Sequence, residues 1–279
     1  MGGTRRMHRA IAVLLICCAA AFALAAAIMA KPYLMGASTL AETQRLRTLP
    51  DETPSPIVAK HHAPSSLESS EESGASDFPQ IDWHGLSACN PDAAAWVYVP
   101  GTRIDHPLVQ AHGSDPQRYL EHDLYGSSSL YGCPYLDASC AAQGGADAPF
   151  VVAYGHSLVT GDMFSDFQRF SDAAYAQEHR RILFLTPAES RELAVVAANV
   201  VDANTERIEL GFSSYAEAAA YVSSKLPECE VVLGAPSPDR RLYCFICCSY
   251  QTDNARTLVY AQECASRALR ATDNAGGNR

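Results

Sequence analysis

Positive charge is scarce in this 279-residue chain and is nowhere gathered into a stripe. Lysine and arginine together number 21, against 31 aspartate and glutamate residues, and the formal net charge is −10. A protein that binds nucleic acid through its phosphates normally presents a basic face. The charge balance therefore argues against a nucleic-acid partner, and we expect the acidity mainly to favour solubility.

Two further patterns are missing. The sequence contains no internal repeat, and none of its cysteine and histidine spacings is typical of a zinc site. The pair His61-His62 is too isolated to indicate a metal ligand set. We therefore predict no metal site.

A long uncharged segment lies near the N-terminus. Residues 10–30, between the basic stretch Arg5 to Arg9 and Lys31, carry no charge and are long enough to cross a hydrocarbon core as a helix. A signal peptide usually has a shorter apolar region, although the alanine-rich end near Ala30 resembles a cleavage site. We favour a single-pass, uncleaved anchor, with residues 1–9 in the cytoplasm and the rest of the chain outside it.

Composition divides the rest of the chain into three parts. Residues 31–77 combine a helix-like piece from Leu40 to Leu49 with a run of Pro, Ser, Glu and His that is typical of a flexible linker. From residue 78 to 266 aromatic and apolar residues dominate, which predicts one folded domain. Residues 267–279 are predicted to be a disordered tail.

The sequence of the folded part predicts many short strands with helices inserted between them. We expect a short helix starting at Asn90-Pro91-Asp92, a helix from Asp115 to His122 capped by Ser114 with Pro116 in its first turn, and a helix from Tyr215 to Lys225 capped by Ser213 or Ser214. Further helical stretches are expected at 162–170 and 172–179, and strands at 96–99, 107–110, 131–137, 150–154, 181–186, 192–203 and from 242 onward. This pattern predicts a small, mostly antiparallel β-barrel and no βαβ units.

The stretch with the strongest chemical signal runs from Leu242 to Gln262 and reads LYCFICCSYQTDNARTLVYAQ. A strand-like run ends at Cys248, a polar turn follows, and Arg256 opens a second strand-like run, so the two side chains are expected to face each other across a cleft. A cationic neighbour favours the thiolate that a cysteine nucleophile needs, and acyl transfer needs donors where negative charge develops. Cys248 is therefore the predicted nucleophile and Arg256 the predicted donor.

A histidine usually completes such a site. The best placed is His156, because the apolar strand pattern FVVAY runs directly into Gly155-His156, and catalytic groups tend to lie at strand ends. Adjacent residues of a strand point to opposite faces, so only one of Cys247 and Cys248 can face the cleft. Alternatively, Cys247 and Cys248 could both be buried structural thiols.

These residues resemble the class B sortases. The family's strand Thr-Leu-x-Thr-Cys, followed by a loop and an arginine, corresponds here to Cys244-Phe245-Ile246-Cys247-Cys248 and Arg256. Cys248-Ser249-Tyr250, the segment around Arg256, Tyr154-Gly155-His156-Ser157 with Asp162-Met163-Phe164, and the runs 96–102, 105–110 and 119–123 are also similar to class B. The resemblance covers residues 81 to 262, and its main departure is Cys247 in place of threonine.

The resemblance implies a sortase barrel of about eight strands with N-terminal helices, inserted helices and a helix before the cysteine strand. It implies a cysteine transpeptidase that cleaves a C-terminal sorting motif of surface proteins after threonine, holds the acyl group on Cys248 as a thioester, and transfers it to an amine of a peptidoglycan precursor or a pilin lysine. His156 would act as general acid and base, and Arg256 would hold the substrate backbone or the oxyanion. Cys247, Ser249 and Tyr250 would contact substrate, and no cofactor is needed.

Three alternatives stay open. A pilin-polymerising sortase would differ in the amine that accepts the acyl group, and an exported cysteine hydrolase would use water. A membrane-tethered binding module would need none of the three reactive residues. Among ten cysteines, those that could form disulfides in an exported protein are Cys89, Cys133, Cys140, Cys229, Cys244 and Cys264, of which Cys133 and Cys140 flank a short loop and are the preferred pair.

Overall fold

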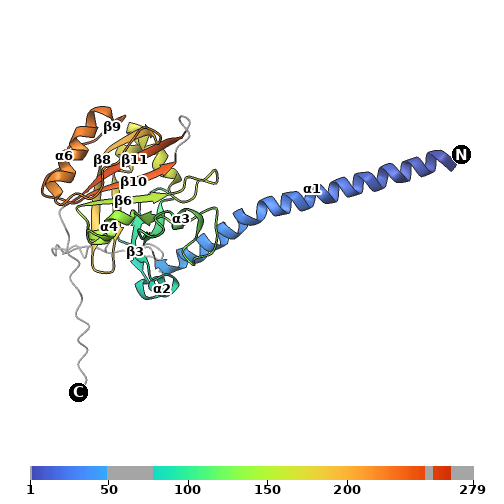
Figure 1. The fold of residues 1–279 in the computed structure, drawn as a ribbon, viewed down its shortest axis with the longest axis horizontal. Helices are drawn as coiled ribbons and strands as arrows, with labels where there is room; N and C mark the ends of the chain where they lie inside the picture. Colours follow the sequence, from blue (N-terminus) through green and yellow to red (C-terminus); the bar gives the residue numbers. More distant parts are fainter. Residues whose placement is uncertain (1, 49–77, 249–253, 265–279) are drawn as a thin grey trace, which may run out of the picture.

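Eight strands of the computed structural model form a sheet that closes on itself (Figure 1). The structure describes residues 2–48, 78–248 and 254–264. With β9, which lies outside the closed ring, the sheet has nine strands: β3 Ala93–Tyr98, β4 Asp105–Gln110, β5 Tyr135–Leu136, β6 Phe150–Gly155, β7 Arg181–Leu185, β8 Ser190–Asp202, β9 Val231–Val232, β10 Leu242–Cys248 and β11 Ala255–Glu263. They neighbour each other in the order β11-β10-β6-β5-β4-β3-β7-β8, and β8 pairs with β11 to close the ring, while β9 adds to β8. The predicted barrel of about eight strands is confirmed.

Helices are inserted between the strands, as the sequence predicts. They are α1 Gly2–Thr43, α2 Trp83–Cys89, α3 Arg118–Glu121, α4 Ala138–Ala141, α5 Ala173–Glu178 and α6 Tyr215–Lys225, with 3-10 helices η1 Gln44–Leu46, η3 Gly145–Asp147, η4 Ser165–Ser171 and η5 Leu226–Glu228. Two short strands, β1 Arg47–Thr48 and β2 Gln80–Ile81, pair with each other beside the barrel.

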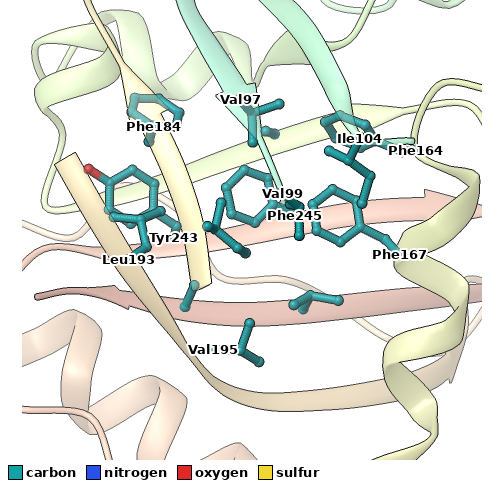
Figure 2. Packing of buried hydrophobic residues seen from close by; sticks show 14 of the residues in the cluster. Val97, Val99, Ile104, Phe164, Phe167, Phe184, Leu193, Val195, Tyr243 and Phe245 are labelled. Carbon is teal, nitrogen blue, oxygen red and sulfur yellow. The ribbon is translucent and has the colours of Figure 1, made fainter. Parts of the chain in front are cut away.

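Aromatic side chains fill the barrel interior (Figure 2). Phe245 of β10 stacks on Phe167 of η4 with ring centroids 5.0 Å apart, and Phe164 meets Phe167 edge-on. All three rings are fully buried, and burying one such ring contributes about 1.5–3 kcal/mol to folding. The interior therefore fixes which face of β10 points inward.

The opposite face of β10 lies under α6. Cys244 and Ile246 pack there with Ala218 and Val222 of that helix. Ser214 caps α6 by accepting a hydrogen bond from the Glu217 backbone N–H, as one of the two predicted caps. The helix expected before the cysteine strand is thus confirmed.

The N-terminal helix α1 extends far from the barrel (Figure 1). Its apolar side chains from Leu14 to Met35 are largely exposed, and the stretch Leu14–Leu46 is long enough to cross a membrane and contains 18 consecutive residues with a mean hydropathy of 2.3. The helix contains the whole of residues 10–30, where the anchor is expected. By length and composition it is a candidate membrane span.

The last part of α1 packs on the barrel. Gly36 is buried against the ring of Tyr131, and beyond the helix Arg47 forms an ion pair with Asp105 at 2.6 Å. The Asp105 carboxylate also accepts a hydrogen bond of 2.7 Å from the Trp96 indole. Residues 31–48, which we assigned to the linker, therefore have regular structure; residues 49–77 and the predicted tail lie outside the described residues.

Two local predictions are wrong because side chains and turns compete with helix formation. Asn90-Pro91-Asp92 follows α2 and does not begin a helix, since the Asn90 side chain accepts a hydrogen bond from the Asp92 N–H and forms a turn. The helix predicted from Ser114 shrinks to α3, because the Asp115 N–H bonds back to the His112 carbonyl. Pro116 therefore opens no helix.

The preferred disulfide is also wrong. All ten cysteines are free in the structure. Cys133 packs outside the barrel with Tyr119 and Tyr135, whereas Cys140 belongs to the interior cluster. The two thiols that flank the loop thus point into separate parts of the core.

The contact of Gly36 with Tyr131 gives a first prediction. A Cβ at residue 36 would lie 2.1 Å from Cδ2 of Tyr131, so Gly36→Ala must displace α1 or the ring. We expect the free energy of unfolding to fall by about 1–3 kcal/mol, the usual range for overpacking. Urea titration of the full chain in detergent micelles, followed by tryptophan fluorescence, measures the change.

The matched control is Ala37→Ser, at the exposed neighbouring position of α1. It should leave the unfolding curve close to that of wild type. Equal curves for Gly36→Ala and wild type would show that α1 does not pack on the barrel through this glycine.

Candidate active site

Three neighbouring strands bring Cys248, His156 and Arg256 into one row. Cys248 of β10 lies directly opposite Arg256 of the antiparallel β11. On the other side β10 runs parallel to β6, with Cys247 opposite Gly155, so the next residues along both strands are Cys248 and His156. The arginine is therefore a cross-strand neighbour on the same face of the sheet, not a residue across a cleft as expected.

The alternation of β10 decides which thiol is available. Cys247 is only 1% exposed and belongs to the interior cluster with Phe245. Cys248 is half-buried and lies on the outer face, in line with Ile246. Burial also raises the pKa of the Cys247 thiol far above its usual range. The structure thus argues against the substrate-binding role that we predicted for Cys247.

His156 is held from behind by a backbone carbonyl. Its Nε2 donates a hydrogen bond of 2.7 Å to the carbonyl oxygen of Leu120, since a carbonyl can only accept. Nδ1 is then the nitrogen left for the thiol. Hydrogen bonding to Cys248 is the main cause that raises the pKa of His156, against the opposing effect of burial.

The thiol shows the matching change. Hydrogen bonding to His156 lowers the pKa of Cys248, burial opposes this, and the positive charge of Arg256 lowers the pKa further. A thiol that loses its proton easily and an imidazole that keeps one favour a thiolate–imidazolium pair. Cys248 therefore has the properties of a nucleophile, and His156 those of a proton donor.

Arg256 is partly exposed, and its guanidinium is fixed by local acceptors. Nη1 donates to the Ala255 carbonyl at 3.0 Å and to the Asn254 side-chain oxygen at 3.4 Å. Asn254 has a φ of 54°, in the left-handed region that asparagine tolerates better than most residues. A guanidinium carries five N–H donors, so further donors can face an anion beside Cys248.

The segment after His156 holds the histidine in place, a role that the sequence motifs around Gly155, Phe164 and His106 did not indicate. Gly155 leaves no room for a side chain, because a Cβ would lie 2.5 Å from the Phe164 ring. The Phe164 N–H donates to the His156 carbonyl at 2.8 Å, and buried His106 contacts the Met163 carbonyl through Nε2 at 3.1 Å. The sequence signal that could have indicated the role of His106 is the position of this histidine inside the apolar strand DHPLVQ.

Other predicted site residues are not placed. Ser249 and Tyr250 lie outside the described residues, so their predicted contacts with substrate stay predictions. Across 2–48, 78–248 and 254–264, no group of three or more His, Cys, Asp or Glu side chains could hold a metal ion.

Comparisons with known proteins find similarity to sortases B. No family model matches the chain. A curated relative, sortase B of Listeria monocytogenes, is 24% identical over 127 residues, which are 46% of this chain and 50% of the relative. The chain thus matches only about half the length of that relative.

Solved structures show the same fold. Sortase B from B. anthracis, in complex with AAEK1, has a TM-score of 0.60 and 20% identity over 84% of this chain and 98% of that one. Sortase B complexed with Gly3 has a TM-score of 0.55 and 17% identity over 66% of this chain and 85% of that one. The resemblance to class B sortases, predicted from the sequence, is confirmed.

The coupled pKa shifts predict how the thiol reacts with pH. Alkylation of Cys248 by iodoacetamide needs the thiolate, so its rate should rise with a midpoint below the ordinary pKa of cysteine. His156→Gln removes the hydrogen bond that is the main cause of the low pKa of Cys248. Burial, which raises this pKa, then weighs more, so the midpoint of alkylation should move to higher pH. Peptide mapping by mass spectrometry measures the rate at each cysteine.

Cys264 provides the internal control, because burial raises its pKa and it is not among the three residues of the row. Its alkylation profile should be the same in both proteins. A Cys248 midpoint that His156→Gln leaves in place would contradict the pairing of thiol and imidazole.

Proposed function

We propose that the chain is a class B sortase, a membrane-anchored cysteine transpeptidase. It cleaves a C-terminal sorting motif of surface proteins and transfers the acyl group through a thioester to a cell-wall or pilin amine. The observation that carries the proposal is the row His156, Cys248 and Arg256 on adjacent strands of a sortase-like barrel. The pKa shifts of the first two support it.

In the first half-reaction the Cys248 thiolate attacks the carbonyl carbon of the scissile peptide bond. Arg256 donates hydrogen bonds to the oxygen that becomes negative, and the carbon–nitrogen bond then breaks. His156 gives its proton to the leaving amine, which would otherwise be a poor leaving group. The products are a thioester on Cys248 and a neutral imidazole.

The second half-reaction reverses these roles. Neutral His156 takes a proton from the incoming amine, whose nitrogen attacks the thioester carbonyl. The carbon–sulfur bond breaks, and Cys248 leaves as a thiolate beside the imidazolium. The name of one structural neighbour, sortase B complexed with Gly3, supports a glycine-type amine as the acceptor probe.

Helix α1 supports a membrane placement of the chain. Its exposed apolar side chains and the basic residues before them support a single-pass anchor with the barrel outside the cytoplasm. In that compartment both the sorting motif of an exported protein and the wall precursor are within reach.

The decisive experiment uses the full chain in detergent micelles, a library of sorting-motif peptides and triglycine. A sortase forms a thioester on Cys248 and, with triglycine, a new amide product that mass spectrometry identifies. A cysteine hydrolase releases only the free acid, even with excess amine. A binding module forms neither product, and a pilin-polymerising sortase prefers a lysine side chain to triglycine.

Cys248→Ala should abolish both the thioester and the amide product, because donors alone cannot replace the nucleophile. The matched variant is Cys247→Thr at the adjacent interior position. Its hydroxyl would lie opposite Thr257, whose buried Oγ1 has no hydrogen-bond partner among the described residues, so we expect a mild effect. A thioester that persists in Cys248→Ala and disappears in Cys247→Thr would place the nucleophile one residue earlier.

Arg256→Lys replaces a fork of donors by a point charge. If the guanidinium stabilises the oxyanion, kcat should fall about a hundredfold or more, the usual scale for one oxyanion donor. If it orients the sorting peptide, KM should rise. Steady-state kinetics separate the two effects, and Arg207→Lys, at an exposed arginine on another segment, should change neither. Wild-type kinetics in Arg256→Lys would remove the arginine from the site.

A further inference from the structure

A pocket opens beside His156, and neither Cys248 nor Arg256 lines it. His156 lies at the end of β6, on one side of Cys248, whereas Arg256 lies on β11, on the other side. The Leu120 carbonyl that holds the imidazole is part of the same pocket wall. A molecule in this pocket would therefore reach the imidazole from the side away from the arginine.

One wall of the pocket is the part of α1 that follows the uncharged residues 10–30. Pro32, Met35 and Thr39 line it, and their spacing places them along one side of the helix. Between them Gly36 is packed against Tyr131, which fixes this part of α1 on the barrel. The pocket therefore exists only where α1 is docked.

The opposite wall comes from α3 and the segment after it. It includes Leu120, Glu121, Asp123 and Ser127 to Leu130. The Asp123 carboxylate is 6% exposed and accepts hydrogen bonds from the Tyr125 and Ser127 N–H groups at 3.0 and 2.9 Å. Asp123 thus holds the backbone of this wall through its hydrogen bonds to residues 125 and 127.

Apart from the histidine, the ionisable side chains that line the pocket are acidic. Its ionisable lining residues are Glu121, Asp123 and His156, and no lysine or arginine is among the described residues that line it. Glu121 is exposed, and its carboxylate makes no hydrogen bond or ion pair within the described parts of the chain. An acidic pocket next to a proton acceptor fits a cation that must lose a proton.

We propose that this pocket binds the ammonium form of the acceptor amine, with Glu121 as its charge partner and α1 as its outer wall. The proposal rests on the proposed transpeptidase function and names the site of its second substrate. An α-amino group has a pKa of about 7.7–8.0, so it arrives mostly as a cation at neutral pH. The carboxylate holds the ammonium, and neutral His156 takes one proton, so that the free amine attacks the thioester carbonyl. As the carbon–sulfur bond breaks, the second proton passes from the nitrogen to the Cys248 sulfur, which leaves the amide, the Cys248 thiol and the His156 imidazolium.

The test is a competition for one acyl-enzyme. The full chain in detergent micelles, loaded with a sorting peptide, receives triglycine and hydroxylamine together. Hydroxylamine is mostly uncharged at neutral pH, so the pocket's charge should favour triglycine. The ratio of the two products, measured by mass spectrometry, is independent of the rate at which the thioester forms.

Glu121→Gln removes the charge partner while keeping the size of the side chain. We expect the ratio of triglycine product to hydroxylamine product to fall by about two- to fivefold, the scale of an exposed charged contact. Glu178→Gln, at an exposed glutamate of α5 outside the pocket, should keep the wild-type ratio.

Met35→Lys tests the α1 wall. A cation at this exposed pocket position should repel the ammonium and lower the same ratio by a similar factor. Ala37→Lys adds the same charge two residues along α1, outside the pocket lining, and should keep the wild-type ratio.

The outcomes separate the two proposals. A wild-type chain that forms no thioester on Cys248 contradicts the transpeptidase function itself. A wild-type chain that forms the thioester, with ratios unchanged in both Glu121→Gln and Met35→Lys, overturns the acceptor pocket alone. A large loss of thioester formation in these variants, with an unchanged ratio, would assign the pocket to the sorting peptide and would also overturn the proposal.

Discussion

The register of β10 between β6 and β11 is the constraint on which the candidate active site depends. A shift by one residue would turn every side chain of the strand to the other face. Phe245 and Cys247 would then leave the interior, and the stacking of Phe245 on Phe167 would be lost. The packing of Phe245 and Cys247 in the interior therefore places Cys248 on the outer face of the barrel, beside His156 and Arg256. This placement does not depend on the contacts of the thiol itself.

The docked end of α1 links the candidate anchor to this site. One continuous helix carries the exposed apolar segment, the contact of Gly36 with Tyr131, and the pocket wall at Met35. From Ala30 to Met35 a helix rises about 8 Å. If the apolar segment spans a membrane, the pocket beside His156 lies close to its surface, where a membrane-bound acceptor would be displayed.

Sequence patterns predicted the features that depend on local periodicity. The strands around Phe245, the helix capped by Ser214 and the candidate span of α1 follow from apolar spacing and capping residues. They could not reveal contacts between distant segments. The Leu120 carbonyl behind His156 and the docking of Gly36 on Tyr131 depend on how the barrel closes, and the turn made by the Asn90 side chain overrode an expected helix.

The central claim is that His156 and Cys248 form one coupled pair across β6 and β10. NMR titration of the His156 imidazole in the wild type and in Cys248→Ala tests it most directly. The hydrogen bond to Cys248 is the main cause that raises the pKa of His156, while burial and Arg256 lower it. Loss of the thiol should therefore shift the titration to lower pH, and an unchanged titration would contradict the account.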